Sequence, residues 1–183
     1  MLVETCLRNE ALIPILKKIG YSSFLIEGGG AVATIGRITL TAEKYPHGEI
    51  DKAFSRGHLV FFRPNSRDSL IKVINDERVC CIVLDNTNLH LYKRPLVRLM
   101  VRKGKFVEVW LRSSSHEVVR RAIELGNRGL KTVFSSCPSK ISEVWSPISK
   151  LNYLLILGAS SPLALTWIYS FPLELYRNAS ANY

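Results

Sequence analysis

The side chains best suited to chemistry stand where predicted strands end. Arg63, Asp85 and Arg112 close or follow apolar runs, and Ser135 and Ser136 close another. In barrels of parallel strands, ligands bind at this carboxyl-terminal edge. Guanidinium and hydroxyl groups suit contact with an anion better than proton transfer, and no nucleophile with an adjacent base can be assembled from this set. The sequence therefore gives little support to an enzyme that acts alone.

Metal and cofactor chemistry also have little basis in the sequence. The histidines, His47, His58, His90 and His116, form no HxH or HExxH motif and no pair at helical spacing. No two histidines are therefore placed by the sequence to bind one metal ion. The run Gly28-Gly29-Gly30 lacks the GxGxxG pattern and predicts a tight turn instead. We expect the protein itself to bind neither a metal ion nor a cofactor.

Cysteine usage indicates a reducing compartment. Cys6, Cys80, Cys81 and Cys137 show no CxxC spacing, and no signal peptide precedes them. This pattern is typical of reduced thiols in a cytosolic protein rather than of a disulfide scaffold or a zinc site. We therefore predict free cysteines and a cytoplasmic location.

Two carboxylates lie in or at the end of predicted strands. Glu27 closes one strand, and Glu108 shares a strand face with Phe106 and Trp110. A buried carboxylate needs a cationic or hydrogen-bonding partner, or it stays protonated. Neither a lysine nor a histidine is tied to these residues by spacing, so we expect structural pairing with an arginine rather than catalysis.

Positive charge concentrates in one segment. The 183-residue chain has a net charge of +10, and residues 93–131 hold 11 Lys and Arg against three Glu, which gives this segment +8. Each phosphate that such side chains neutralise releases condensed counterions, so the segment favours a nucleic-acid partner. The candidate RNA contacts are Arg94, Arg98, Arg102, Lys103, Lys105, Arg112, Arg120 and Arg121, with Arg63 as an outlying contact.

Short runs rich in β-formers recur along the chain and must position these residues. Several are continuously apolar, as in Leu59-Val60-Phe61-Phe62, which is typical of parallel strands covered on both faces. The predicted strands are 2–7, 23–27, 37–42, 58–63, 80–85, 106–111, 131–135 and, with a weaker pattern, 163–166.

Helical segments with legible ends lie between the strands. The run Ser114-Ser115-His116-Glu117 has the form of a capping box, and Ser146 is a predicted N-cap followed by proline at the first helical position. Asn65 or Ser66 opens a helix over 68–76, and Pro95 begins another that ends at Gly104. A further helix runs from Asn9 toward Gly20, with Pro14 inside it.

Strands alternating with helices predict an α/β protein, a compact TIM-barrel-like (β/α) barrel with about eight short parallel strands. With 47% hydrophobic residues the chain can form a real core, and we expect one domain over residues 1–183. An open doubly wound sheet is the alternative. Residues 151–173 carry no charge, but Gly, Ser and Pro interrupt them. They therefore predict a buried helix, a turn, a strand and a short final helix rather than a membrane span.

Several residue patterns along the chain resemble those of a known family, the archaeal ribonuclease P protein component 3, counterpart of the eukaryotic 30-kDa subunit. The C-terminal likeness lies in Val133-Phe134-Ser135-Ser136-Cys137, Trp145-Ser146-Pro147 and Leu157-Gly158. The helix ending at Lys103-Gly104 and the strand Phe106-Val107-Glu108-Val109 are similar to the family's preceding segment. The opening strand Val3-Glu4-Thr5-Cys6 and the Gly20-Tyr21 turn also fit.

The resemblance implies a TIM-barrel-like fold and a non-catalytic subunit of ribonuclease P, the RNA-based endonuclease that removes the 5′ leader from precursor tRNA. In this family the RNA and its magnesium ions perform the chemistry. The protein holds the catalytic RNA in its active form, usually together with protein component 2. The expected partners are therefore ribonuclease P RNA, component 2 with other protein subunits, and precursor tRNA, without a membrane.

Two positions depart from the family pattern. Trp145 stands where the family commonly has arginine. The barrel is also related to metal-dependent phosphoesterases, whose first-strand histidine pair is absent from Glu4-Thr5-Cys6-Leu7-Arg8, in agreement with a binding role. The rival hypothesis is a free-standing barrel enzyme that acts on a phosphorylated small molecule held at the strand ends. Such an anion needs only two or three donors, fewer than the basic segment supplies.

Overall fold

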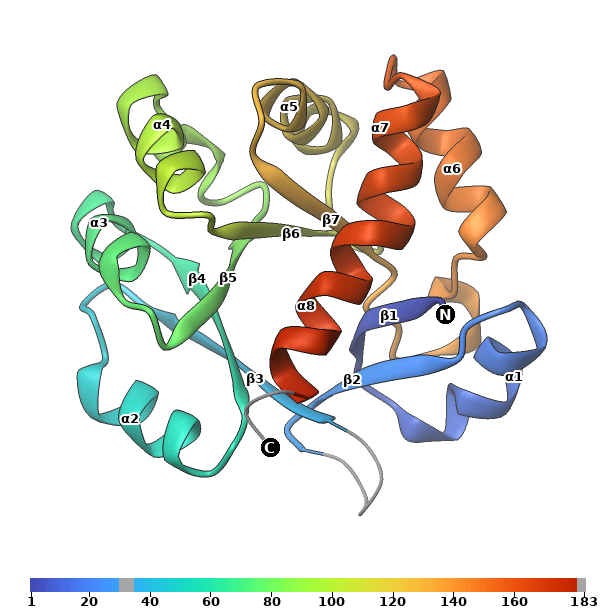
Figure 1. The fold of residues 1–183 in the computed structure, drawn as a ribbon, viewed down its shortest axis with the longest axis horizontal. Coiled ribbons are helices and arrows are strands. Elements are labelled where there is room, and N and C mark those ends of the chain that lie inside the picture. Colours follow the sequence, from blue (N-terminus) through green and yellow to red (C-terminus); the bar gives the residue numbers. More distant parts are fainter. Residues whose placement is uncertain (30–34, 181–183) are drawn as a thin grey trace.

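The computed structural model describes residues 1–29 and 35–180, whose strands form a nearly closed barrel (Figure 1). Within these residues the sheet has seven strands in the order β1 to β7, and each strand pairs in parallel with the next along the chain. The strands are β1 (Val3–Leu7), β2 (Ser23–Glu27), β3 (Ile35–Ala42), β4 (Leu59–Pro64), β5 (Val79–Leu84), β6 (Phe106–Trp110) and β7 (Lys131–Ser135). The predicted TIM-barrel-like fold is confirmed, and the open-sheet alternative is not.

Helices surround the barrel and carry the connections between strands. The N-caps Ser66 and Ser146 are confirmed, and each side chain accepts a hydrogen bond from the backbone N–H three residues later. Helix α5 (His116–Asn127) begins one residue later than the predicted capping box, because Ser115 rather than Ser114 is its N-cap and accepts from the Val118 N–H. The helices are α1 (Ile13–Lys18), α2 (His47–Ser55), α3 (Arg67–Asn75), α4 (Arg94–Arg102), α5 (His116–Asn127), α6 (Pro147–Ile156), α7 (Ser161–Leu165) and α8 (Phe171–Ser180). Short 3₁₀ turns cover Glu10–Leu12, Leu89–Leu91 and Ile141–Glu143.

The predicted eighth strand, 163–166, is wrong. These residues belong to α7 and to the π-helical turn η4 (Thr166–Ser170), which joins α7 to α8 in one continuous rod (Figure 1, orange to red). Pro162 lies in the first turn of α7, where the missing N–H of proline leaves no helical hydrogen bond unmade. Helix α8 contacts both β1 and β7, the two edge strands of the described sheet.

Helix α8 covers the amino-terminal end of the barrel. Phe171 packs edge-on against Phe106 with ring centroids 6.0 Å apart, and the Glu174 carboxylate is 2.6 Å from the Lys131 ammonium. Phe106 and Lys131 are the first residues of β6 and β7. Leu175 is fully buried and belongs to the apolar cluster inside the barrel. The carboxyl-terminal end of the barrel is therefore the end that α8 leaves free.

The uncharged segment 151–173 is divided between α6 and the α7–α8 rod. Among the described residues, no helix is both long enough and apolar enough to cross a membrane. At the turn predicted after β2, Gly28 and Gly29 have φ of 86° and 96°, a conformation that glycine adopts without strain. Gly30 lies outside the described residues.

The rod is anchored by Trp167, which is buried against Phe134 and against the backbone of α5 at Gly126. A Cβ atom at Gly126 would lie 2.5 Å from Trp167 Cζ2, far inside van der Waals contact. The indole ring is large and rigid, so this packing leaves no room for a side chain at position 126.

We predict that Gly126→Ala lowers the free energy of unfolding by about 1–3 kcal/mol, the usual cost of overpacking a core. The matched control is Gly48→Ala in α2, where a Cβ meets nothing within 4 Å. That substitution should be neutral or stabilising by up to about 1 kcal/mol, because alanine favours helix. Urea denaturation of the three proteins measures both changes, and equal stability of the Gly126→Ala variant and the wild type would contradict the packing argument.

Candidate functional site

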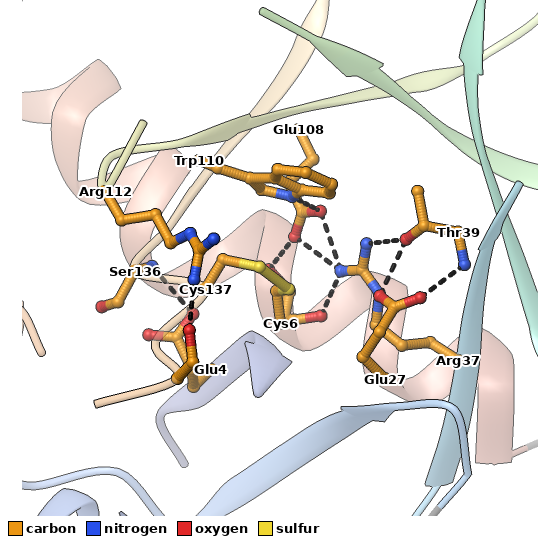
Figure 2. The surroundings of a disulfide bond; sticks show 12 residues. Glu4, Cys6, Glu27, Arg37, Thr39, Glu108, Trp110, Arg112, Ser136 and Cys137 are labelled. Atoms are coloured by element: carbon orange, nitrogen blue, oxygen red, sulfur yellow. Dashed lines mark hydrogen bonds and ion pairs between the residues drawn. A yellow bond between two sulfur atoms is a disulfide. The ribbon is translucent and has the colours of Figure 1, made fainter. Parts of the chain in front are cut away.

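The interior of the barrel holds a buried arginine between two carboxylates (Figure 2). Arg37 of β3 is fully buried, with Nη1 2.8 and 3.0 Å from the two carboxylate oxygens of Glu108 on β6. Its Nε is 3.0 Å from Glu27 at the end of β2. The predicted pairing of both glutamates with an arginine is confirmed. Burial alone would lower the pKa of Arg37, but Glu108 and Glu27 outweigh it and raise that pKa.

Hydrogen bonds complete this network. Glu108 accepts from Thr5 Oγ1 at 2.5 Å and from Trp110 Nε1 at 2.8 Å, while Arg37 also donates to the Thr5 carbonyl. The Arg37 guanidinium stacks on Phe61 with its carbon 3.4 Å from the ring centroid. Because Glu108 accepts from three different residues inside the barrel, it serves as a structural anion rather than a base held ready for proton transfer.

A second buried ion pair lies between the barrel and α6. Lys150 Nζ is 2.8 Å from Glu4 Oε2, and both side chains are almost fully buried. The other Glu4 oxygen accepts the backbone N–H of Ser136, which follows β7. Tyr21 lies beside this pair and donates to the Trp145 carbonyl at 3.0 Å. Burial raises the pKa of Tyr21 to about 12, although Lys150 opposes the shift.

The structure corrects the prediction that all cysteines are free. A disulfide joins Cys6 in β1 to Cys137 just after β7, across a sequence separation of 131 residues (Figure 2). The spacing of these cysteines carries no signal, because they become neighbours only when the two edge strands meet. Cys80 and Cys81 are free, and burial raises the pKa of both thiols.

The predicted strand-end residues do share the carboxyl-terminal rim, but most are already paired. Arg63 forms an ion pair with Asp85 and a 3.2 Å hydrogen bond to Thr87. Arg112 donates to Ser139 and lies 3.2 Å from the Glu143 carboxylate. An anion that binds at this rim must therefore compete with carboxylates of the protein.

Helices α4 and α5 lie next to each other outside the barrel (Figure 1). A groove of about 660 Å³ between them is lined by arginines that, unlike those at the rim, have no carboxylate partner in the described chain. We call it the arginine groove. Its lining residues are Arg94, Val97, Arg98, Val101, Arg102 and Arg128. The four arginines are exposed and form no ion pair within the described chain.

The remaining predicted contacts lie around this groove. Lys103 is exposed at the end of α4. Arg120 and Arg121 line a second groove of about 810 Å³ at the start of α5, together with Lys93, His90 and His116. Two carboxylates, Glu117 and Glu124, also line this second groove, and Glu124 is 2.6 Å from Arg121.

Lys105 does not share the surface with the other basic residues. It is 8% exposed, and its ammonium donates to the backbone carbonyls of Asp76 at 2.6 Å and Val79 at 2.7 Å. Burial lowers the pKa of this lysine. Its position in the charged segment predicted a phosphate contact, but the start of β6 turns the side chain inward to bond the start of β5. Lys105 is therefore a structural residue and is not offered to a phosphate.

Two exposed arginines that were not among the predicted contacts lie next to predicted ones. Arg128 follows the end of α5 and faces the α4 arginines across the groove. Arg8 follows β1 and stacks on Trp110, with its guanidinium carbon 4.9 Å from the ring centroid. Partial burial and the neighbouring Arg112 lower the pKa of Arg8. Arg128 belongs to the basic segment 93–131, so the sequence could have indicated it. Arg8 is far from that segment in sequence, and only the folded barrel brings it to the same rim as Arg112.

Within residues 1–29 and 35–180, no group of three or more His, Cys, Asp and Glu side chains is placed to hold a metal ion.

Comparison with known proteins supports the fold of this chain but does not identify a family for it. No family model matches the chain, and no curated protein matches it. One similar solved structure is that of an uncharacterized protein, at 15% identity and a TM-score of 0.54, covering 89% of this chain and 47% of that one. Another is a Xaa-Pro dipeptidase with methionine bound in its active site, at 13% identity and a TM-score of 0.53, covering 93% and 47%. The chain spans about half the length of each, and at these identities the likeness shows the fold alone.

We predict that breaking the buried network costs far more than breaking an exposed ion pair. Arg37→Met leaves two buried carboxylates without their cation and should lower the free energy of unfolding by about 3–5 kcal/mol. Arg121→Met, the same substitution in a pair at the surface of α5 whose arginine is partly exposed and whose glutamate is exposed, should cost about 0.5 kcal/mol or less. Chemical denaturation compares the two, and similar costs would show that the Arg37 network is not what stabilises the barrel.

The raised pKa of Tyr21 predicts a loss of stability in alkali. Because the folded protein holds the neutral phenol, this contribution is fully present below the ordinary tyrosine pKa of about 10. It declines as the pH rises toward the folded-state pKa of about 12. Between these pH values the free energy of unfolding of the wild type should therefore decrease relative to that of the Tyr21→Phe variant. A difference that stays constant over that range would contradict the assignment.

Proposed function

We propose that this chain is a protein subunit of ribonuclease P, the RNA-based endonuclease that removes the 5′ leader from precursor tRNA. The observation that carries the proposal is the arginine groove, where four guanidinium groups are exposed and unneutralised within the described chain. The resemblance of the chain to protein component 3 supports the same assignment, because it runs from the opening strand to the Leu157-Gly158 end of α6.

In this proposal the protein contributes charge rather than chemistry. Closely packed RNA helices repel one another, and guanidinium groups that clamp two phosphate oxygens reduce that repulsion. The exposed cations offered to phosphates are Arg94, Arg98, Arg102, Lys103, Arg120 and Arg128. Arg63, Arg112 and Arg121 must exchange a carboxylate partner for a phosphate, so we rank their contributions lower.

The barrel interior supports a non-catalytic role for the isolated protein. Carboxylates that a barrel enzyme would use are here bound to Arg37, Thr5 and Trp110. The proposed chemistry belongs to the ribonuclease P RNA and its magnesium ions, with precursor tRNA as substrate. Protein component 2 and other protein subunits are the proposed protein partners.

A cytoplasmic location, without membrane attachment, stays a prediction. Disulfides are rare in most cytosolic proteins, and the bond between Cys6 and Cys137 therefore does not favour this location. Both cysteines are fully buried, which shields them from thiols in solution.

The test is the magnesium dependence of precursor tRNA cleavage by ribonuclease P RNA with component 2, in the presence and absence of this protein. We expect the protein to lower the magnesium requirement, since bound cations replace some of the counterions that the folded RNA needs. The Arg98→Gln/Arg102→Gln variant should lose most of this effect. The Lys17→Gln/Lys18→Gln variant removes the same charge from exposed positions on α1 and should retain it.

Two outcomes would contradict the proposal. A folded wild-type protein that leaves the magnesium requirement unchanged would exclude the subunit role, and a screen of phosphorylated small molecules would then test the rival barrel enzyme. An equal reduction of the effect in both double variants would show that total charge, rather than the arginine groove, produces it.

A further inference from the structure

The arginine groove has a shape and a composition that distinguish between forms of RNA. Arg94, Arg98 and Arg102 are spaced by four residues on α4, so successive guanidinium groups rise by about 6 Å along the helix axis. Arg128 stands on the other wall, and Val97 with Val101 forms the apolar part of the lining. The cations thus form a row about 12 Å long, which suits an extended polyanion better than a single phosphate.

No carboxylate is among the residues that line this groove in the described chain. The neighbouring groove at the start of α5 differs, because Glu117 and Glu124 line it and Arg121 is paired there. Every cation of the arginine groove is therefore available to a ligand without first leaving a protein carboxylate.

Apart from the guanidinium planes of the arginines, the described lining residues offer none of the groups that recognise unpaired bases. Proteins bind single strands mainly by stacking bases on aromatic rings and by hydrogen bonds to base edges. The arginine groove offers four guanidinium groups and two valine side chains, with neither an aromatic ring nor an amide or hydroxyl side chain. Tyr92 lies close by in sequence, but its side chain is buried and donates to the Val83 carbonyl.

These features favour a ligand whose phosphates are already ordered. An unpaired strand loses conformational entropy when it is fixed along a row of cations, and this groove offers little stacking in return. A paired RNA helix holds its phosphates at fixed spacing before it binds. The free-energy cost of ordering is then small, and charge neutralisation by the row is retained.

We propose that the arginine groove binds the sugar–phosphate backbone of paired, helical RNA in preference to unpaired RNA, without reading its sequence. This inference rests on the RNA-binding role proposed above, and it specifies which part of an RNA the groove contacts. Arg94, Arg98 and Arg102 contact successive phosphates along one strand, and Arg128 contacts the backbone from the opposite wall.

The test compares binding of the full chain to two RNAs of equal length, a fully paired hairpin and an unpaired uridine-rich strand, across a series of salt concentrations. Equal length keeps the number of phosphates the same, so any difference reports on pairing. We expect the hairpin to bind about tenfold tighter or more at moderate salt. A second hairpin of different sequence should bind within about twofold of the first, as expected for contacts to phosphates alone.

The Arg98→Gln/Arg102→Gln variant assigns this preference to the groove. Hairpin affinity should fall by about tenfold or more. The slope of log affinity against log salt should decrease by about two, because each arginine removed leaves one phosphate without its cation. The Lys17→Gln/Lys18→Gln variant should match the wild type on both RNAs, because α1 lies elsewhere on the barrel surface (Figure 1).

Equal or tighter binding of the unpaired strand would overturn the inference, because it would mean that the guanidinium planes stack on bases. An unchanged salt slope in the Arg98→Gln/Arg102→Gln variant, or an equal fall in affinity in both variants, would overturn it as well.

These results are separable from failure of the proposed function. A preference for paired RNA without any effect on precursor tRNA cleavage would support the inference about the arginine groove and exclude the ribonuclease P role. An effect on cleavage without a preference for paired RNA would support the ribonuclease P role and overturn the inference about the groove.

Discussion

The ion network around Arg37 is the constraint on which the barrel depends. It ties β2, β3 and β6 together through Glu27, Arg37 and Glu108, next to the apolar cluster inside the barrel. A cation placed there is tolerated only with both carboxylates and their hydrogen bonds in position. Because both carboxylates and the guanidinium are bound to one another, this network is part of the packed interior of the barrel.

The distribution of ion pairs separates structural cations from candidate functional ones. Arg37 and Lys150 are buried with carboxylate partners, and Lys105 is buried against backbone carbonyls. The arginines on α4 have an exposed position and no carboxylate partner in the described chain. Net charge alone does not make this distinction, because all of these residues contribute equally to the total of +10.

Local patterns predicted most of the fold, and contacts between distant residues could not be predicted. The continuous apolar run at β4 and the serine N-caps of α3 and α6 depend on neighbours in sequence, and they were confirmed. Helix α2 has no side-chain cap at Pro46 and so carries no start signal. Arg37 and Glu108 lie 71 residues apart, so the need for an arginine partner could be predicted and its identity could not. The inward turn of Lys105 likewise depends on where β5 lies beside β6.

The disulfide between Cys6 and Cys137 gives the molecule an unusual covalent topology. With this bond formed, residues 6–137 constitute a closed ring that contains the last two residues of β1 and all of β2 to β7. Helices α6 to α8 extend from this ring as a carboxyl-terminal tail. One cut by a protease at any loop within the ring leaves a single covalent molecule, whereas one cut between the ring and α7 ends the covalent link between the barrel and the rod that covers its amino-terminal end. The barrel wall is thus covalently protected against a single break, and its cover is not.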